Sequence, residues 1–341
     1  MVPSKNNFFD HVRWLRAAVQ AQGGELLITG DSLQALIRRG NDHWLLLPHF
    51  LASTNGQSSY VPQITDDVTH FAGWLPYRGR RWPAATDKLI FKRFAVQAGL
   101  RTPECSVDAQ AQMNDIVVKR ATSSFGAQIK GPFRASAECP LNVAQGEYYE
   151  RFVEGDILKI WYWNASPIAL EIDDMPTVTG DGHSTFDVLI RKRATLMQKQ
   201  SEERLVQFAA RSSEVLRHCG KSLDDVPARG TKQIVEFRYG SELMHPRGRR
   251  VVDLTDEAQS GWQILRTAGS SLVSALPEAM RADTLFTVDA VRDRKRQVWL
   301  LEMNSNPTVH PLAYRSIVSG LMSRGRQPAP SPLSARTPET V

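Results

Sequence analysis

Two apolar segments near the end of the chain, separated by a short charged link, constrain the fold more than any other feature. TLFTVDAVRD spans residues 284–293 and RQVWLLEMN spans residues 296–304, with DRKR as the turn between them. Apolar runs rich in β-branched and aromatic residues, joined by such a turn, predict an antiparallel hairpin. In this hairpin Asp289 and Glu302 come side by side. The sequence therefore predicts a pair of carboxylates in the middle of two apolar strands.

Amide oxygens accompany these carboxylates. Strand alternation puts Glu302, Asn304 and Asn306 on one face, and Asp289 faces them from the partner strand. Such hard oxygen atoms are the ligands that Mg²⁺ prefers. The alternative is a strand that leaves the core and ends in an Asx turn at Asn306-Pro307. We expect Asp289, Glu302 and Asn304 to be the metal ligands.

Length and composition indicate a soluble globular chain. Its 341 residues can bury a substantial core and allow two or three domains. The 42 basic and 36 acidic residues leave a net charge of +6, and the basic residues fall in short clusters without an aromatic-interleaved motif. This pattern favours anionic small molecules over nucleic acid as partners.

Cysteine spacing and hydropathy bear on the location of the protein. Cys105, Cys139 and Cys219 are far apart, odd in number and have no histidine nearby. Neither a disulfide framework nor a zinc site is expected, and a reducing cytoplasm fits best. The first residues lack a basic segment followed by an apolar stretch, and the longest apolar run, 44–52, is interrupted by proline and histidine. We expect no signal peptide and no membrane span.

The first part of the chain reads as a short α/β domain over residues 1–84. Residues 8–22 have helical periodicity, and GGELLIT follows as a turn and a strand. DSLQALIRR, residues 31–39, is expected as a capped helix, and HWLLLP as a second strand.

The second part predicts a mixed α+β arrangement. A helix is expected to begin at Thr86 or Asp87 and to end at Gly99, and a long helix covers roughly 185–218. Strands in runs outnumber βαβ units. Apart from the hairpin, the expected strands are 115–120, 147–153, 156–164, 166–173 and 232–240.

A candidate phosphate site follows the strand DIVVKR. Lys119 ends this apolar strand, and the small residues ATSSFGA after it can fold their backbone N–H groups over phosphate oxygens. An ordinary hairpin is the alternative, and no GxxxxGK[ST] motif is present. Lys88, at the start of the helix, is a second candidate phosphate contact, with simple solvation as its alternative.

A candidate adenine site lies in EYYERFVEG, residues 147–155. An apolar strand that contains Glu150 runs into Gly155. Backbone groups and a carboxylate at a strand end can match the donor and acceptor edge of adenine. The alternative for this segment alone is an ordinary edge strand.

In this order, the elements resemble the ATP-grasp superfamily over roughly residues 86–312. MPTVTGDGHSTFDVLI (175–190), VPARGTKQIVEFRYGS (226–241) and VVDLTDEA (251–258) are similar to blocks of cyanophycin synthetase and of the ATP-grasp module of bifunctional glutathione synthetases. Three such blocks in order are specific, whereas each alone is not.

The resemblance implies an α+β, ATP-grasp fold in which two α+β subdomains clasp ATP. This domain would cover residues 85–324, with a lid subdomain at about 105–150, after the short N-terminal α/β domain. Residues 325–341 have no apolar face and much proline, and we expect them to be a disordered tail.

The resemblance also implies the roles of individual residues. Lys88 and Lys119 would contact the phosphates of ATP, and Gly126 would lie in the loop that closes over them. Glu150, Arg151 and Val153 would hold adenine. Asp156 would contact the ribose. Asp289, Glu302 and Asn304 would bind two Mg²⁺ ions, for which Mn²⁺ is an expected substitute. Arg238 would stabilise the transferring phosphoryl group, and Arg238 and Lys119 are the catalytic candidates.

The chain departs from the family pattern in several places. Ile157 occupies the position at which relatives place the ribose-binding acid, and Asp156 lies one residue earlier. Tyr239-Gly240 follows Arg238 where relatives carry Glu-Asn. This difference is expected to alter the part of the site that binds the acceptor substrate. The basic RGRR replaces a glycine pair before VVDLTD. Nothing corresponds to the extra domains of the bifunctional enzymes, so a free-standing ligase is expected.

The expected activity is an ATP-dependent carboxylate–amine ligase that forms an amide or peptide bond through an acyl phosphate. Its partners would be small-molecule or peptide carboxylate and amine substrates, with no nucleic acid and no membrane, and a homodimer is left open. One rival is an ATP-grasp small-molecule kinase. Another is a regulatory nucleotide-binding module without turnover, against which the intact metal ligands argue.

Overall fold

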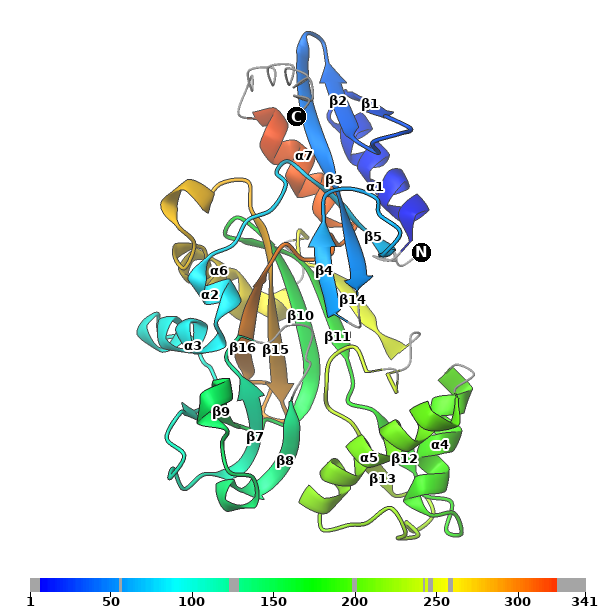
Figure 1. Cartoon of the computed structure of the whole chain (residues 1–341). Coiled ribbons are helices and arrows are strands. Elements are labelled where there is room, and N and C mark those ends of the chain that lie inside the picture. Colours follow the sequence, from blue (N-terminus) through cyan, green and yellow to red (C-terminus); the bar gives the residue numbers. More distant parts are fainter. Residues whose placement is uncertain are drawn as a thin grey trace, which may run out of the picture. The chain divides into compact units, whose positions relative to one another are not determined.

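The structure is a computed structural model of the chain, and it describes residues 7–54, 57–122, 129–197, 201–241, 243–244, 248–256 and 260–323. The chain divides into two compact units (Figure 1). One combines the N-terminal segment up to Gly79 with the segment from Thr308, and the other spans Arg80–Pro307. The expected disordered tail, 325–341, lies outside the described residues.

In its described residues, the first unit contains two helices and a five-stranded antiparallel sheet. The sheet order is β1-β2-β3-β4, with β5 paired to β3. The expected helix at 8–22 and the two expected strands are confirmed. The elements are α1 (Phe8–Ala21), β1 (Glu25–Ile28), β2 (Ala35–Arg39), β3 (Asp42–Thr54), β4 (Gln57–Val61), β5 (Val68–Leu75) and α7 (Ala313–Ser323).

Residues 31–39, expected as a helix, instead form a turn and the strand β2. Ala35 pairs with Ile28 of β1 and with Leu46 of β3. Ala35 and Ile37 are fully buried, so alternate positions of this strand enter the core. The helix prediction was wrong because pairing on both sides outweighs a weak local helix preference.

The C-terminal helix α7 belongs to the first unit, although the expected domain boundary placed it in the second. Tyr314 connects it to two other elements of this unit. Its hydroxyl lies 2.7 Å from His11 Nδ1 in α1 and accepts a hydrogen bond of 3.1 Å from the backbone N–H of Trp74 in β5. All three residues are fully buried, so this polar contact is paired inside the core.

The second unit contains three antiparallel sheets, which confirms the expected α+β class. Their orders are β14-β11-β10-β15-β16, β6-β9-β7-β8 and β12-β13. The strands are β6 (Cys105–Ser106), β7 (Asn114–Arg120), β8 (Lys130–Ala135), β9 (Glu147–Arg151), β10 (Gly155–Trp163), β11 (Ser166–Asp173), β12 (Thr177–Thr179), β13 (Lys232–Ile234), β14 (Arg250–Asp253), β15 (Leu285–Asp293) and β16 (Val298–Ser305). The helices are α2 (Pro83–Thr86), α3 (Lys88–Gln97), α4 (Phe186–Met197), α5 (Glu202–His218) and α6 (Gln263–Ser274).

The expected elements of this unit are mostly confirmed. Asp87 caps α3, since its Oδ1 accepts hydrogen bonds from the backbone N–H groups of Leu89 and Ile90. The expected helix at 185–218 is described as α4 and α5. The expected strand 232–240 is shorter, because only β13 pairs with another strand. Among the helices that the structure describes, none is long and apolar enough to cross a membrane.

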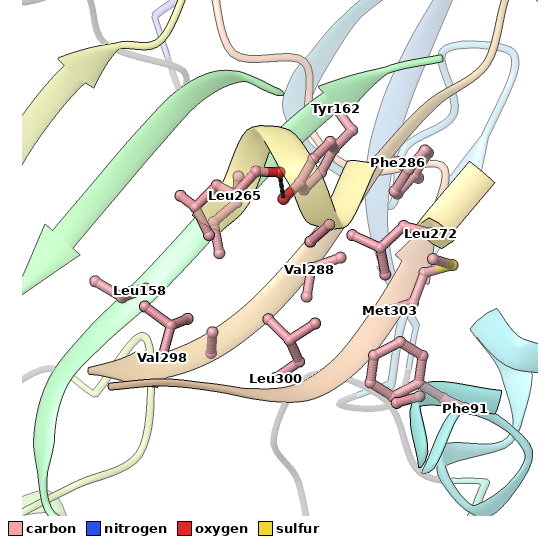
Figure 2. Packing of buried hydrophobic residues seen from close by; sticks show 14 of the residues in the cluster. Phe91, Leu158, Tyr162, Leu265, Leu272, Phe286, Val288, Val298, Leu300 and Met303 are labelled. Atoms are coloured by element: carbon pink, nitrogen blue, oxygen red, sulfur yellow. Dashed lines mark hydrogen bonds between the residues drawn. The ribbon is translucent and has the colours of Figure 1, made fainter. Parts of the chain in front are cut away.

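One face of the sheet that contains β10, β15 and β16 packs against α3 and α6 (Figure 2). Leu158 from β10, Val288 from β15 and Leu300 from β16 contribute to this core. Tyr162, also in this core, donates a hydrogen bond of 3.1 Å from its hydroxyl to the carbonyl oxygen of Leu265 in α6. Because side chains alternate along a strand, the residues between these apolar positions point to the opposite face.

A bulge in β16 sets which residues face the core. Asp289 is paired with Glu302, whereas the next residue, Ala290, is paired with Leu300, so Leu301 is the additional residue. Without it, Leu300 and Glu302 would lie on the same face. With it, Leu300 packs in the core and Glu302 faces the other way beside Asp289.

The packing of α6 on the sheet generates a stability prediction. A Cβ atom at Gly269 would lie 1.9 Å from the carbonyl oxygen of Ala165, which is backbone and cannot move aside cheaply. Gly269→Ala should lower the free energy of unfolding by about 3 kcal/mol, although alanine favours a helix. Urea denaturation measures this change. Gly261→Ala is the matched control, because no atom of the described residues lies within 4 Å of its added Cβ atom; an equal loss in both variants would contradict this explanation.

Candidate active site

A row of charged residues crosses the sheet on the face opposite the core. Glu171 of β11 pairs with Lys159 of β10, Lys159 pairs with Asp289 of β15, and Asp289 pairs with Glu302 of β16. The predicted hairpin neighbours, Asp289 and Glu302, are thus confirmed as partners. Lys159 Nζ lies 2.8 Å from Asp289 Oδ1, so the row is joined by at least one direct ion pair.

Asn304 and Lys88 complete the surroundings of the two carboxylates. The Asn304 side-chain amide donates a hydrogen bond of 3.1 Å to Asp289 Oδ2. Lys88 Nζ, from the first residue of α3, lies 3.2 Å from Glu302 Oε2. The structure therefore brings together the three expected metal ligands, Asp289, Glu302 and Asn304. We name these three residues the acidic cluster.

Asn306 does not belong to the acidic cluster, contrary to the expectation from alternation. Its Oδ1 accepts a hydrogen bond of 2.8 Å from the backbone N–H of Arg80, and its Nδ2 donates one of 2.7 Å to the Arg80 carbonyl oxygen. Its φ of 49° ends the strand, which breaks the alternation at this residue. Asn306 holds the chain at Arg80 instead.

The acidic cluster fits a hard divalent cation by its donor chemistry. Two carboxylates and an amide supply oxygen ligands, and Mg²⁺ usually adds several waters to such a set. Two ammonium groups, those of Lys88 and Lys159, already lie against the carboxylates. Within the described ranges, no group of three or more histidine, cysteine, aspartate or glutamate side chains has metal-site geometry. Oxygen donors of this kind suit Mg²⁺ better than a transition metal.

A second cluster, which we name the lysine cluster, consists of Lys92, Lys119 and Glu150. Lys119 Nζ lies 2.5 Å from Glu150 Oε1, and Lys92 Nζ lies 2.7 Å from Glu150 Oε2. Burial alone would raise the pKa of Glu150, but the two lysines outweigh this effect and hold the pKa below its ordinary value. Glu150 therefore remains an anion between two cations.

Lys92 was not predicted from the sequence. It lies four residues after Lys88 on α3, one helical turn away, and this spacing was the available signal. Its side chain is only 2% exposed. Burial lowers the pKa of Lys92, and the neighbouring Glu150 opposes that shift.

The start of α3 brings the two clusters close to each other. The backbone N–H of Lys88 donates a hydrogen bond of 2.9 Å to the carbonyl oxygen of Ala121, just after β7. Lys119 is near the end of the same strand, as expected. Lys88 and Lys119 therefore lie on adjoining segments. Gly126, the expected loop residue, lies outside the described residues.

The expected adenine hinge lies where β9 ends and β10 begins. Arg151 is the last residue of β9, and Val153 lies in the connection before Gly155. The backbone N–H of Phe152 donates a hydrogen bond of 2.6 Å to the carbonyl oxygen of Asp115 beside β7. This hydrogen bond anchors the connection to β7. Arg151 and Val153 closely follow Glu150, a member of the lysine cluster, in the sequence.

Asp156, the expected ribose contact, faces away from the acidic cluster. It lies on the same side of β10 as Leu158, which belongs to the core. Its carboxylate accepts hydrogen bonds from the Arg292 guanidinium, from Nε at 3.1 Å and from Nη2. Strand alternation thus removes Asp156 from the face that carries Lys159, and the structure corrects its assignment to a nucleotide site.

Arg238 lies in a loop after β13, where a longer strand was expected. Its guanidinium is 2.8 Å from Glu214 of α5 and 2.9 Å from Glu236. It also donates hydrogen bonds to the carbonyl oxygens of Ile129 and Gly131 at the start of β8. In the described part of the chain these contacts tie α5 to β8. They do not bring Arg238 to the acidic cluster.

Tyr239, the residue after Arg238, contacts the row of charged residues. The Tyr239 hydroxyl donates a hydrogen bond of 3.1 Å to Glu171 Oε2, and Lys159 Nζ lies 4.9 Å from the centre of the Tyr239 ring. Burial, followed by the nearby Glu171, raises the pKa of Tyr239 well above its ordinary value. Arg249 pairs with Glu171 at 3.1 Å and with Asp173 at 2.8 Å. This network was not predicted and lies next to Lys159.

Comparison with known proteins finds similar solved structures. No family model and no curated protein matches the chain. A bifunctional glutathione synthetase from Pasteurella multocida has a TM-score of 0.42 and 13% identity, covering 94% of this chain and 44% of that one. D-alanine–D-alanine ligase from Bacillus anthracis has a TM-score of 0.38 and 9% identity, covering 70% and 66%.

A third similar structure is that of the ATP-grasp ligase PsnB complexed with a minimal precursor. Its TM-score is 0.34 and its identity 8%, covering 71% of this chain and 62% of that one. The chain thus spans less than two thirds of the length of each of these three proteins.

The ion pair at Asp289 generates a prediction about cation binding. Lys159 Nζ pairs with this carboxylate at 2.8 Å, so a divalent cation that bound there would have to displace it. Lys159→Met should therefore tighten binding of Mn²⁺ to the nucleotide-free protein by about tenfold, as measured by electron paramagnetic resonance. Lys130→Met is the control, since Lys130 is paired with Glu147 instead. Unchanged or weaker Mn²⁺ binding in Lys159→Met would contradict competition at this site.

Proposed function

We propose that the protein is an ATP-grasp enzyme, an ATP-dependent carboxylate–amine ligase that releases ADP and acts on amino acids or peptides. The observation that carries this proposal is the adjacency of the two clusters through Lys88. A cationic cluster suits phosphate oxygens, and an acidic cluster suits Mg²⁺. Both are needed to hold a nucleoside triphosphate with its metal.

In the proposed complex, Lys88 and Lys119 contact the phosphates. The backbone of Arg151 and Val153 holds the adenine edge at the β9–β10 connection. Asp289, Glu302 and Asn304 hold Mg²⁺, which offsets phosphate charge when it is bound. Glu150 was expected at the adenine edge; because both of its carboxylate oxygens contact lysines, we propose instead that it acts through these two cations.

The proposed reaction makes a carboxylate reactive toward an amine. A carboxylate oxygen of the substrate attacks the γ-phosphorus of ATP, the bond from this phosphorus to the β–γ bridging oxygen breaks, and ADP leaves. The amine nitrogen then attacks the acyl carbon, phosphate leaves with the original carboxylate oxygen, and the nitrogen loses a proton. The protein's part is to position the reactants and to neutralise charge. No covalent nucleophile is needed.

The acceptor side of the site is proposed to involve the network of Tyr239, Glu171 and Arg249. It adjoins Lys159 on the face that carries the acidic cluster. The half-buried Tyr239 ring lies beside the Lys159 ammonium group at this position. We therefore assign the choice of substrate to this network, with the identity of the acid and amine left to experiment.

The acidic cluster generates a test by mutation. Asp289→Asn and Glu302→Gln should abolish Mg²⁺-dependent turnover, by at least a hundredfold, while the fold is retained. The two changes remove charge and leave the side-chain volume almost unchanged. Asp156→Asn is the matched control, because its carboxylate lies on the opposite face of the same sheet. Near-normal turnover in both cluster variants would remove this site from consideration.

The acyl phosphate generates an isotope test. With oxygen-18 in the substrate carboxylate, released phosphate should carry the label, because the attacking oxygen ends on phosphorus. Phosphate without the label would exclude the acyl-phosphate route. Mass spectrometry of the phosphate gives this result directly, independently of any mutation.

Arg238 generates a separate prediction. We propose that its guanidinium stabilises the transferring phosphoryl group, for which it must leave Glu214 and the β8 carbonyl oxygens. Arg238→Lys should lower turnover by roughly a hundredfold with little change in ATP affinity, since charge builds there only during reaction. A parallel loss of ATP affinity would instead identify Arg238 as a structural tie between α5 and β8.

A further inference from the structure

The lysine cluster has one more positive than negative charge. Glu150 is the carboxylate that both Lys92 and Lys119 contact, at 2.7 and 2.5 Å. Glu150 and Lys92 side chains are each 2% exposed. A buried charge without compensation is costly, so a second cation beside one carboxylate needs a reason.

The two lysines differ in their access to a ligand. Lys92 projects from α3 behind Glu150 and is almost completely enclosed, whereas the Lys119 side chain is 9% exposed and lies near the end of β7. An incoming anion would therefore meet Lys119 first. Lys92 would therefore affect such an anion by its charge and not by direct contact.

The second cation changes what it costs to move Lys119. In a simple Lys119–Glu150 pair, turning the ammonium group toward a phosphate would leave Glu150 buried and unpaired, and Glu150 would repel the phosphate. With Lys92 in place, Glu150 keeps a partner 2.7 Å away while Lys119 turns. The cluster without ligand has a surplus of one positive charge, which a phosphate group would neutralise.

We propose that Lys92 is a positioning residue that keeps Lys119 available to phosphate by compensating Glu150, without itself touching the nucleotide. This inference rests on the proposed function, because it takes the anion at Lys119 to be a phosphate group of ATP. It adds a role for a residue that the proposed reaction does not use.

The experiment measures binding of a non-hydrolysable ATP analogue with Mg²⁺ by calorimetry. Lys92→Met should weaken binding by about tenfold or more, since Glu150 then holds Lys119 in a closed pair. Adding Glu150→Gln to Lys92→Met should recover affinity to within a few-fold of Glu150→Gln alone. Lys221→Met is the control for loss of a lysine; its ammonium group bonds Gln233, and affinity should not change.

Each outcome bears on a separate statement. If the double variant binds much more weakly than Glu150→Gln alone, Lys92 contacts the nucleotide itself and the proposal is wrong. This comparison does not need the single Lys92→Met variant, so it decides the matter even if that variant fails to fold. If Lys119→Ala weakens binding and Lys92→Met does not, the inference fails while the proposed function stands. If the wild-type protein binds no ATP analogue, the proposed function fails.

Discussion

Side-chain alternation in the sheet that contains β10, β11, β15 and β16 fixes where the charged residues of the second unit lie. One face must be apolar to pack against α6. The residues between the apolar positions then face the other way in a fixed register. Glu171, Lys159, Asp289 and Glu302 therefore lie in one row without any loop to position them. The burial that stabilises the sheet also fixes the spacing of its charges.

The two clusters have opposite charge and come from different parts of the second unit. The acidic cluster lies on the β15–β16 hairpin, and the lysine cluster lies between α3, β7 and β9. Lys88 joins them, because it contacts Glu302 by its side chain and Ala121 by its backbone. A site with both charges side by side suits a polyphosphate that is carried with a metal ion, and that is why the proposed function rests on this junction.

The sequence predicted what depends on local periodicity and short links. The hairpin and its Asp289–Glu302 pair follow from two strand patterns and a short turn, and the structure has them. The bulge at Leu301, the turn of Asn306 toward Arg80 and the burial of Lys92 depend on tertiary contacts, so no local pattern could predict them. The position of Asp156 could have been predicted from the sequence. It lies two residues before Leu158 in an apolar strand, so alternation already placed it on the core face.

If phosphoryl transfer serves amide formation, as we propose, ADP formation must depend on the amine, and it can be measured with and without one. Amino acids and dipeptides would be supplied as acids and as amines, with mass detection of the products. We propose a ligase and therefore expect ADP release that requires both an acid and an amine, together with a product of the two joined with loss of water. ADP release that continues without any amine and leaves a stable phosphate ester would contradict it and indicate a kinase.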